Sequence, residues 1–151
     1  MKALLQRVSE AKVTVDSKII GEIGQGWLLL LGVGRGDSEA EISKLSEKIL
    51  GLRLFSDVDG KFNLSVQDVG GQILVVSQFT LFADCSRGRR PGFSNAASPD
   101  VAKDLYERFV TELRKAGITV ATGEFGADMK VSLVNDGPVT IMLDSEEIAK
   151  A

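Results

Sequence analysis

Two uninterrupted apolar runs constrain the fold of this chain more than any other feature. They are residues 27–33 (WLLLLGV) and residues 73–76 (ILVV). A strand with one face in solvent alternates apolar and polar residues, whereas a strand buried on both faces is apolar throughout. Both runs are far shorter than the roughly 20 residues that cross a bilayer. The chain must therefore cover both faces of a central sheet.

Residues 38–51 predict a helix that could provide part of this cover. Ser38 and Glu41 have the spacing of a capping box, in which each residue's side chain bonds the other's backbone N–H. Apolar residues then recur at helical spacing and form one stripe, made of Ile42, Leu45, Ile49 and Leu52.

Residues 98–117 predict a second helix. Ser98 is a favourable N-cap, Pro99 suits the first helical position, and Gly117 can adopt the left-handed conformation of a C-terminal cap. One apolar face is expected from Val101, Leu105, Phe109 and Leu113.

Shorter apolar or alternating segments predict further strands at residues 12–16, 118–122, 129–133 and 139–143. The Asp59-Gly60 pair predicts a hairpin turn. No linker or internal repeat divides the 151 residues, so we expect a single domain over 1–151. We predict an α/β fold of curved, mixed, barrel-like sheet layers with two main helices packed on them.

The composition excludes several classes of function. The chain has no histidine, which removes a histidine triad, an imidazole base and every histidine-ligated metal site. Its one cysteine, Cys85, has no partner for an intrachain disulfide. The net charge of −3 argues against a broad basic surface for nucleic acid. Arg7 and Glu10 interrupt the region where a signal peptide would be apolar, so we expect a cytoplasmic protein without membrane, metal or cofactor.

Two loops resemble ligand-binding motifs but do not meet their requirements. Residues 32–39 (GVGRGDSE) join a predicted strand to a helix, yet Asp37 replaces the third glycine of the dinucleotide motif and would repel phosphate. Residues 57–66 resemble a calcium loop, but Lys61 and Phe62 occupy a ligand position and the glycine position. A nucleotide-binding protein that uses residues 32–36 remains an alternative function.

The segment 77–84 (SQFTLFAD) is the first candidate site. Here an apolar strand is followed by the polar residues Ser77, Gln78 and Thr80. The aromatic residues Phe79 and Phe82 lie beside them. Hydroxyl groups can orient a substrate, and a glutamine amide can donate to a developing oxyanion. An ordinary polar strand end explains the same pattern.

The segment 86–93 (SRGRRPGF) is the only basic cluster in this acidic chain. Arginine matches phosphate bidentately, and an aromatic ring can stack on a base. A solvated charged loop is the alternative interpretation. The candidate anion contacts are Arg87, Arg89, Arg90 and Phe93.

The segment 135–140 (NDGPVT) is dense in turn residues and is expected to separate two strands. Gly137 permits unusual backbone angles, and the bond before Pro138 can be cis. A simple hairpin turn is the alternative.

Four segments together resemble the D-aminoacyl-tRNA deacylase family, also called D-tyrosyl-tRNA deacylase. They are SQFTL at 77–81, NDGPVT at 135–140, the GRRPGF loop and the MKALLQRV start. The match runs from residue 1 to about residue 145. The resemblance implies a homodimer with active sites at the interface. It also implies hydrolysis of D-aminoacyl-tRNA and of glycyl-tRNA, including glycine mischarged on alanine tRNA.

The resemblance also implies roles for individual residues. Ser77, Gln78, Phe79 and Thr80 match the catalytic motif. Gly137 and Pro138 match a Gly-cisPro motif that enters the partner's pocket and excludes L-amino acids. Arg7 matches an arginine that orients this motif, and the remaining motif positions are Asn135, Val139 and Thr140.

Without histidine, little acid–base work can fall on side chains, which favours assistance by the ribose hydroxyl of the tRNA itself. The candidates for oxyanion stabilisation are the backbone N–H groups near Phe79 and Thr80 and the amide of Gln78. Thr80 as a nucleophile is the second choice because nothing nearby would activate it. A non-enzymatic RNA-binding module that uses residues 87–90 is the other competing class.

Overall fold

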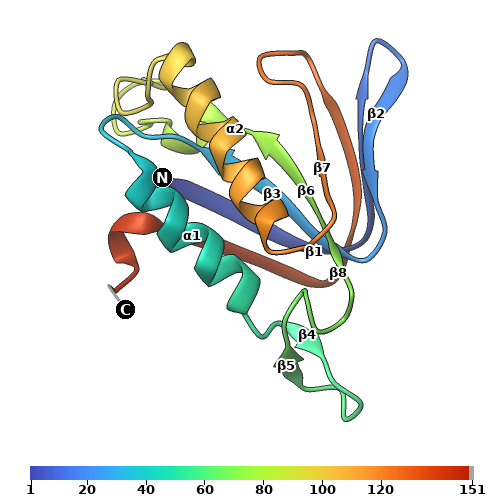
Figure 1. Cartoon of the computed structure of the whole chain (residues 1–151). Coiled ribbons are helices and arrows are strands. Elements are labelled where there is room, and N and C mark those ends of the chain that lie inside the picture. The colour runs from blue at the N-terminus through green and yellow to red at the C-terminus, as the bar shows by residue number, and fades with distance from the viewer. Residues whose placement is uncertain (150–151) are drawn as a thin grey trace.

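A six-stranded mixed sheet, with β3 at its centre, forms the body of the molecule (Figure 1). The computed structural model describes residues 1–149. The strand order is β2-β1-β3-β6-β7, and β8 pairs with the other edge of β1. The strands of this sheet are β1 (Lys2–Val15), β2 (Lys18–Ile23), β3 (Gly26–Gly32), β6 (Gln72–Ser77), β7 (Val120–Thr122) and β8 (Lys130–Asp144).

The two apolar runs become β3 and β6, which pair in parallel and are buried on both faces as expected. Alternate side chains of β3 enter two separate core clusters: Trp27 and Leu29 belong to one, and Leu28 belongs to the other. Each fully buried Leu or Val contributes about 1.5–3 kcal/mol of stability. The central sheet is therefore held from both sides.

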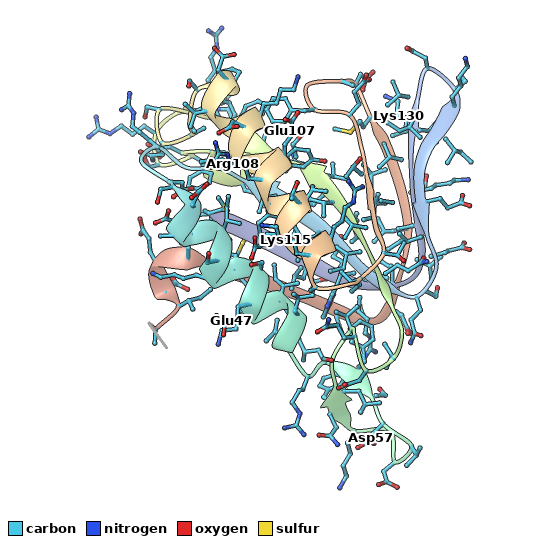
Figure 2. All side chains as sticks on the ribbon, viewed as in Figure 1. Glu47, Asp57, Glu107, Arg108, Lys115 and Lys130 are labelled. Carbon is cyan, nitrogen blue, oxygen red and sulfur yellow. The ribbon has the colours of Figure 1, made fainter. Side chains whose placement is uncertain are left out.

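Two helices, α1 (Glu39–Gly51) and α2 (Pro99–Lys115), cover one face of the sheet (Figure 1). The charged side chains of Glu47, Glu107 and Lys115 are exposed on these helices (Figure 2). The structure confirms the expected α/β fold, with two helices packed on a barrel-like sheet.

The capping box of α1 is present, because the Ser38 side chain accepts from the Glu41 backbone N–H and Ser38 N–H donates to Glu41 Oε2 (2.5 Å). Ala40 N–H also donates to Ser38 Oγ (3.4 Å). Leu52 lies one residue beyond the helix and packs on the same core.

The second helix has the predicted N-cap residue, but one member of its predicted apolar face is wrong. Ser98 occupies the N-cap position, but its side chain makes no capping hydrogen bond. Val101 is 47% exposed, because the buried face runs instead through Ala102, Leu105, Phe109 and their neighbours. Gly117 has the expected positive φ, +83°.

The sheet curves until its edge strands nearly meet. Strand β2 was not predicted from the sequence, because Gly21 interrupts its run of apolar residues. A Cβ atom on Gly21 would lie 2.3 Å from the carbonyl oxygen of Thr122 in β7. Glycine is therefore required where the two edges approach each other.

The expectation that residues 135–140 separate two strands is wrong. Strand β8 runs through them and pairs with β1 on both sides. Gln6 lies opposite Thr140 and Val8 lies opposite Asn135, so Arg7 alone faces residues 136–139. Those four residues therefore bulge out of a continuous ladder.

A small hairpin extends from the body, with strands β4 (Phe55–Ser56) and β5 (Phe62–Leu64). Gly60 in its turn has φ +74°, as the Asp59-Gly60 pair predicted. The 3₁₀ turns η1 (Phe79–Phe82) and η2 (Ser145–Glu147) complete the fold. Within residues 1–149, no helix has both the length and the apolar character needed to span a membrane.

Candidate active site

The parallel strands β3 and β6 end side by side at a pocket of about 590 Å³. Ligands of α/β folds commonly bind at the carboxyl ends of parallel strands. The pocket is lined by residues from β6, η1, α2 and two loops, among them Ser77, Gln78, Phe79, Phe93, Tyr106 and Phe125. The structure thus brings three residues of the SQFTL motif and one from residues 86–93, here called the arginine loop, into one pocket.

Strand β6 ends at Ser77, and the chain then turns into η1. Gln78 N–H still donates to the Leu31 carbonyl (2.8 Å), which continues the ladder, and Leu81 N–H donates to the Gln78 carbonyl (3.3 Å). The first N–H groups of a helical turn have no carbonyl acceptor within that turn. The N–H groups of Phe79 and Thr80 are in this position, so they can serve an oxyanion.

Thr80 is exposed, and the side-chain amide of Gln78 donates to its Oγ1. A donated hydrogen bond withdraws electron density from the hydroxyl oxygen and makes it a poorer nucleophile. Within the described residues, no carboxylate or amine accepts a proton from this hydroxyl. The arrangement suits Thr80 to orient Gln78 rather than to attack a carbonyl carbon.

The arginine loop closes on itself and packs against η1. Asp84 and Gly92 exchange backbone hydrogen bonds of 2.7 and 2.9 Å, and the Phe93 and Phe79 rings meet edge to face at 4.9 Å. This contact leaves Phe79 57% exposed at the pocket. The loop's exposed arginines are Arg87, Arg89 and Arg90.

Residues 32–36 do not form a phosphate cradle. Gly34 N–H already donates to Asp37 Oδ2 at 2.5 Å, and a Cβ on Gly32 would lie 3.1 Å from the Gln78 carbonyl oxygen. The loop is therefore closed by its own aspartate and by η1, which disfavours the nucleotide-binding alternative.

The bulge in β8 is held by a clamp beneath it. Arg7 is only 8% exposed, and it donates from Nε to the Asp136 carbonyl (3.1 Å) and from Nη1 to the Leu54 carbonyl (2.8 Å). Asn135 Nδ2 donates to the carbonyls of Arg7 (2.9 Å) and Val139 (3.0 Å). Side chains from both β1 and β8 thereby fix the bulge.

Gly137 and Pro138 lie exposed at the tip of this bulge, and the peptide bond between them is cis. Thr140 also belongs to the network, with its Oγ1 3.5 Å from Asn135 Oδ1. The bulge therefore presents backbone, rather than a long side chain, to its surroundings.

The bulge and the pocket lie at opposite ends of β3 in one chain. Arg7 pairs with Trp27 at the start of β3, and Leu31 at its end pairs with Ser77. Four residues of strand span about 13 Å at roughly 3.3 Å each. A single chain therefore does not bring Gly137 and Pro138 to the pocket.

The pocket-lining residues that were not identified from the sequence include two aromatic ones, Tyr106 and Phe125. Tyr106 lies on the buried face of α2, and its hydroxyl donates to the Val75 carbonyl (2.9 Å). Phe125 packs beside it, with ring centroids 5.8 Å apart. Helical spacing could have located Tyr106, but Phe125 lies in a loop where no sequence pattern marks it.

Burial raises the pKa of Tyr106 to about 12. The phenol therefore keeps its proton at neutral pH and cannot act as a general base.

We expect the free energy of unfolding to fall at alkaline pH as a result. Tyr106 loses its proton at a pKa of 10.0 when unfolded and about 12 when folded. Its contribution to the free energy of unfolding is therefore fully present below pH 10 and is lost as the pH rises through 12. Two pKa units correspond to about 2–3 kcal/mol. Urea unfolding at about pH 9 and about pH 11.5 should show a smaller alkaline loss in Tyr106→Phe than in the wild type. Equal losses would contradict the assignment.

Comparison with known proteins identifies the family of this chain. Residues 4–144 match the family model described as D-Tyr-tRNA(Tyr) deacylase. A protein of Roseiflexus castenholzii named "D-aminoacyl-tRNA deacylase" is 61% identical over 145 residues, covering 96% of this chain and 92% of the relative. One of Thermotoga petrophila with the same name is 57% identical over 148 residues, covering 98% and 99%.

Two solved structures are also similar. The "c-Myc DNA Unwinding Element Binding Protein" has a TM-score of 0.90 and 42% identity, with 95% of this chain and 98% of that chain covered. A probable eukaryotic D-amino acid tRNA deacylase has a TM-score of 0.79 and covers 94% and 97%, and its 21% identity supports the fold alone.

Proposed function

Because the chain belongs to the D-Tyr-tRNA(Tyr) deacylase family and is a D-aminoacyl-tRNA deacylase, we propose that its pocket at the ends of β3 and β6 hydrolyses the aminoacyl ester. The substrate is a D-amino acid, or glycine, joined to the terminal adenosine of tRNA, and glycine mischarged on alanine tRNA is included. Charged tRNA is used in the cytoplasm, where we place this activity.

The observation that carries this proposal is the start of η1 at the pocket. Water attacks the ester carbonyl carbon, and the negative charge that develops on the carbonyl oxygen is stabilised by the N–H groups of Phe79 and Thr80 and by Gln78. The bond to the ribose oxygen then breaks, the ribose oxygen takes up a proton, and the free amino acid and tRNA leave.

The proton transfers are assigned to the substrate rather than to the protein. The chain has no histidine, and the hydroxyl of Thr80 accepts a hydrogen bond from Gln78 instead of bonding a base. The neighbouring ribose hydroxyl of the tRNA would accept a proton from the attacking water and pass its own proton to the departing ribose oxygen. The enzyme then contributes position and charge stabilisation.

Chirality is assigned to Gly137 and Pro138 of a second copy of the chain. The two motifs lie at opposite ends of β3 in one chain, whereas a homodimer can place the bulge of one copy at the pocket of the other. A rigid backbone wall beside the α-carbon would leave room for hydrogen only. An L side chain would clash with this wall, while D-amino acids and glycine would be accepted.

The arginine loop is assigned to the tRNA. Arg87, Arg89 and Arg90 are exposed on a loop joined to the pocket through Phe93, so they can contact phosphates near the acceptor end.

The proposal is tested by measuring the release of free amino acid from paired D- and L-aminoacyl-tRNAs and from glycyl-tRNA. Rapid release of D-amino acid and glycine, with L-aminoacyl-tRNA left intact, is expected. Tight tRNA binding without release would support a non-enzymatic RNA-binding module instead.

We expect Thr80→Val to reduce kcat by less than about tenfold, because the hydroxyl orients Gln78 and does not attack the ester. Loss of a nucleophile would instead reduce kcat by several powers of ten, on the order of the whole catalytic effect. Single-turnover hydrolysis of D-aminoacyl-tRNA measures this difference. A trapped ester on Thr80 would contradict it.

A further inference from the structure

The loop at residues 32–37, which the proposed function leaves unused, lies directly beneath η1. A Cβ on Gly32 would lie 3.1 Å from the Gln78 carbonyl oxygen, and a Cβ on Gly34 would lie 2.8 Å from two ring carbons of Phe82. A Cβ at Gly32 would press on the backbone of η1, and a Cβ at Gly34 would press on the Phe82 ring. Two glycines therefore set how closely η1 approaches the strand.

Asp37 fixes this loop in place. Its Oδ2 accepts the Gly34 N–H at 2.5 Å, and the Gly34 carbonyl accepts the Asp37 N–H at 3.2 Å. The same carboxylate oxygen lies 2.8 Å from the α-amino nitrogen of Met1. The peptide groups on both sides of Gly34 are thus held by one residue.

Phe82 connects the loop to the backbone N–H groups at the start of η1. It is the last residue of η1, whose first two residues carry the free N–H groups. Its ring faces Gly34 on one side, and Lys2 Nζ lies 4.8 Å from the ring centroid. Because η1 is a single short turn, we expect a Phe82 ring that is pushed away from Gly34 to draw the turn with it and to reorient the N–H groups of Phe79 and Thr80.

We propose that Gly32, Gly34 and Asp37, here called the glycine seat, are positioning residues for deacylation. They hold η1 at the distance from β3 at which its free N–H groups face the ester oxygen. This inference rests on the proposed function. An error of about 1 Å in the placement of such groups can slow a reaction about 100-fold.

The test is the kinetics of Gly34→Ala on D-aminoacyl-tRNA. We expect kcat to fall about 10- to 100-fold, while KM changes less than about threefold, because the glycine seat lies behind η1 and does not contact substrate. Adding Phe82→Leu removes the two ring carbons that the new methyl group would meet, so the double variant should regain most of kcat. Gly51→Ala, at the end of α1 with no atom within 4 Å of the new Cβ, is the matched control and should keep kcat.

Asp37→Asn and Asp37→Ala provide a second arm in case Gly34→Ala does not fold. Asparagine keeps an acceptor for the Gly34 N–H, so its kcat should clearly exceed that of the alanine variant. Wild-type kinetics in a folded Gly34→Ala, no recovery in the double variant, or equal kcat in the two Asp37 variants would overturn the inference. A wild-type enzyme inactive on D-aminoacyl-tRNA would refute the proposed function instead.

Discussion

Gly137→Ala is expected to lower the preference for D- over L-aminoacyl-tRNA by about 10- to 200-fold, which corresponds to about 1–3 kcal/mol. Gly137 has φ +134°, and a Cβ there would lie 2.9 Å from Val139 Cγ2, 3.0 Å from Val139 N and 3.2 Å from an Arg7 nitrogen. The methyl group cannot be accommodated without displacing the clamp. The backbone wall would then move, and L side chains could enter the pocket.

The measurement is the ratio of kcat/KM for paired D- and L-aminoacyl-tRNAs. Gly117→Ala is the matched control, because Gly117 also has a positive φ, +83°, but no atom lies within 4 Å of its added Cβ. Both variants carry a backbone strain of about 1–3 kcal/mol, and only Gly137→Ala should change selectivity. An unchanged ratio in Gly137→Ala would place the wall elsewhere.

The parts of the fold that the sequence predicts well depend on local chemistry. The capping box of Ser38 and Glu41 spans three residues, and Gly60 and Gly117 adopt the positive φ that their turns require. The apolar runs behind β3 and β6 are similarly direct, because burial on both faces leaves no polar positions. Each of these signals is complete within a short segment.

The clamp could not be derived from local patterns. Arg7 lies in the interior of a strand, and its carbonyl acceptors, Leu54 and Asp136, are 47 and 129 residues away in sequence. Strand β8 was divided because turn residues at 135–138 dominate the local pattern. Pairing with β1 on both sides of the bulge carries the strand through them. Tertiary pairing overrides turn preference here.

Phe79→Pro is expected to lower kcat by about 100- to 1,000-fold relative to Phe79→Ala. Both variants lose the aromatic ring and its contact with Phe93, but only proline also removes the N–H group. Phe79 is the first residue of η1, where proline's fixed φ is compatible with a helical turn. Gln78 before it has φ −147° and ψ +81°, outside the helical region that a following proline disfavours. The substitution therefore removes one donor and leaves the turn in place.

Single-turnover hydrolysis of D-aminoacyl-tRNA by saturating enzyme separates this effect from binding, because the ring lost in both variants alters substrate binding equally. The donor matters only when charge develops on the ester oxygen, so its loss should appear in kcat and leave KM close to that of Phe79→Ala. Equal kcat in the two variants would mean that the Phe79 N–H does not contact the oxyanion. Stabilisation would then have to come from the Thr80 N–H and the Gln78 amide, and a Gln78→Ala variant of the proline enzyme would reveal it as a further loss.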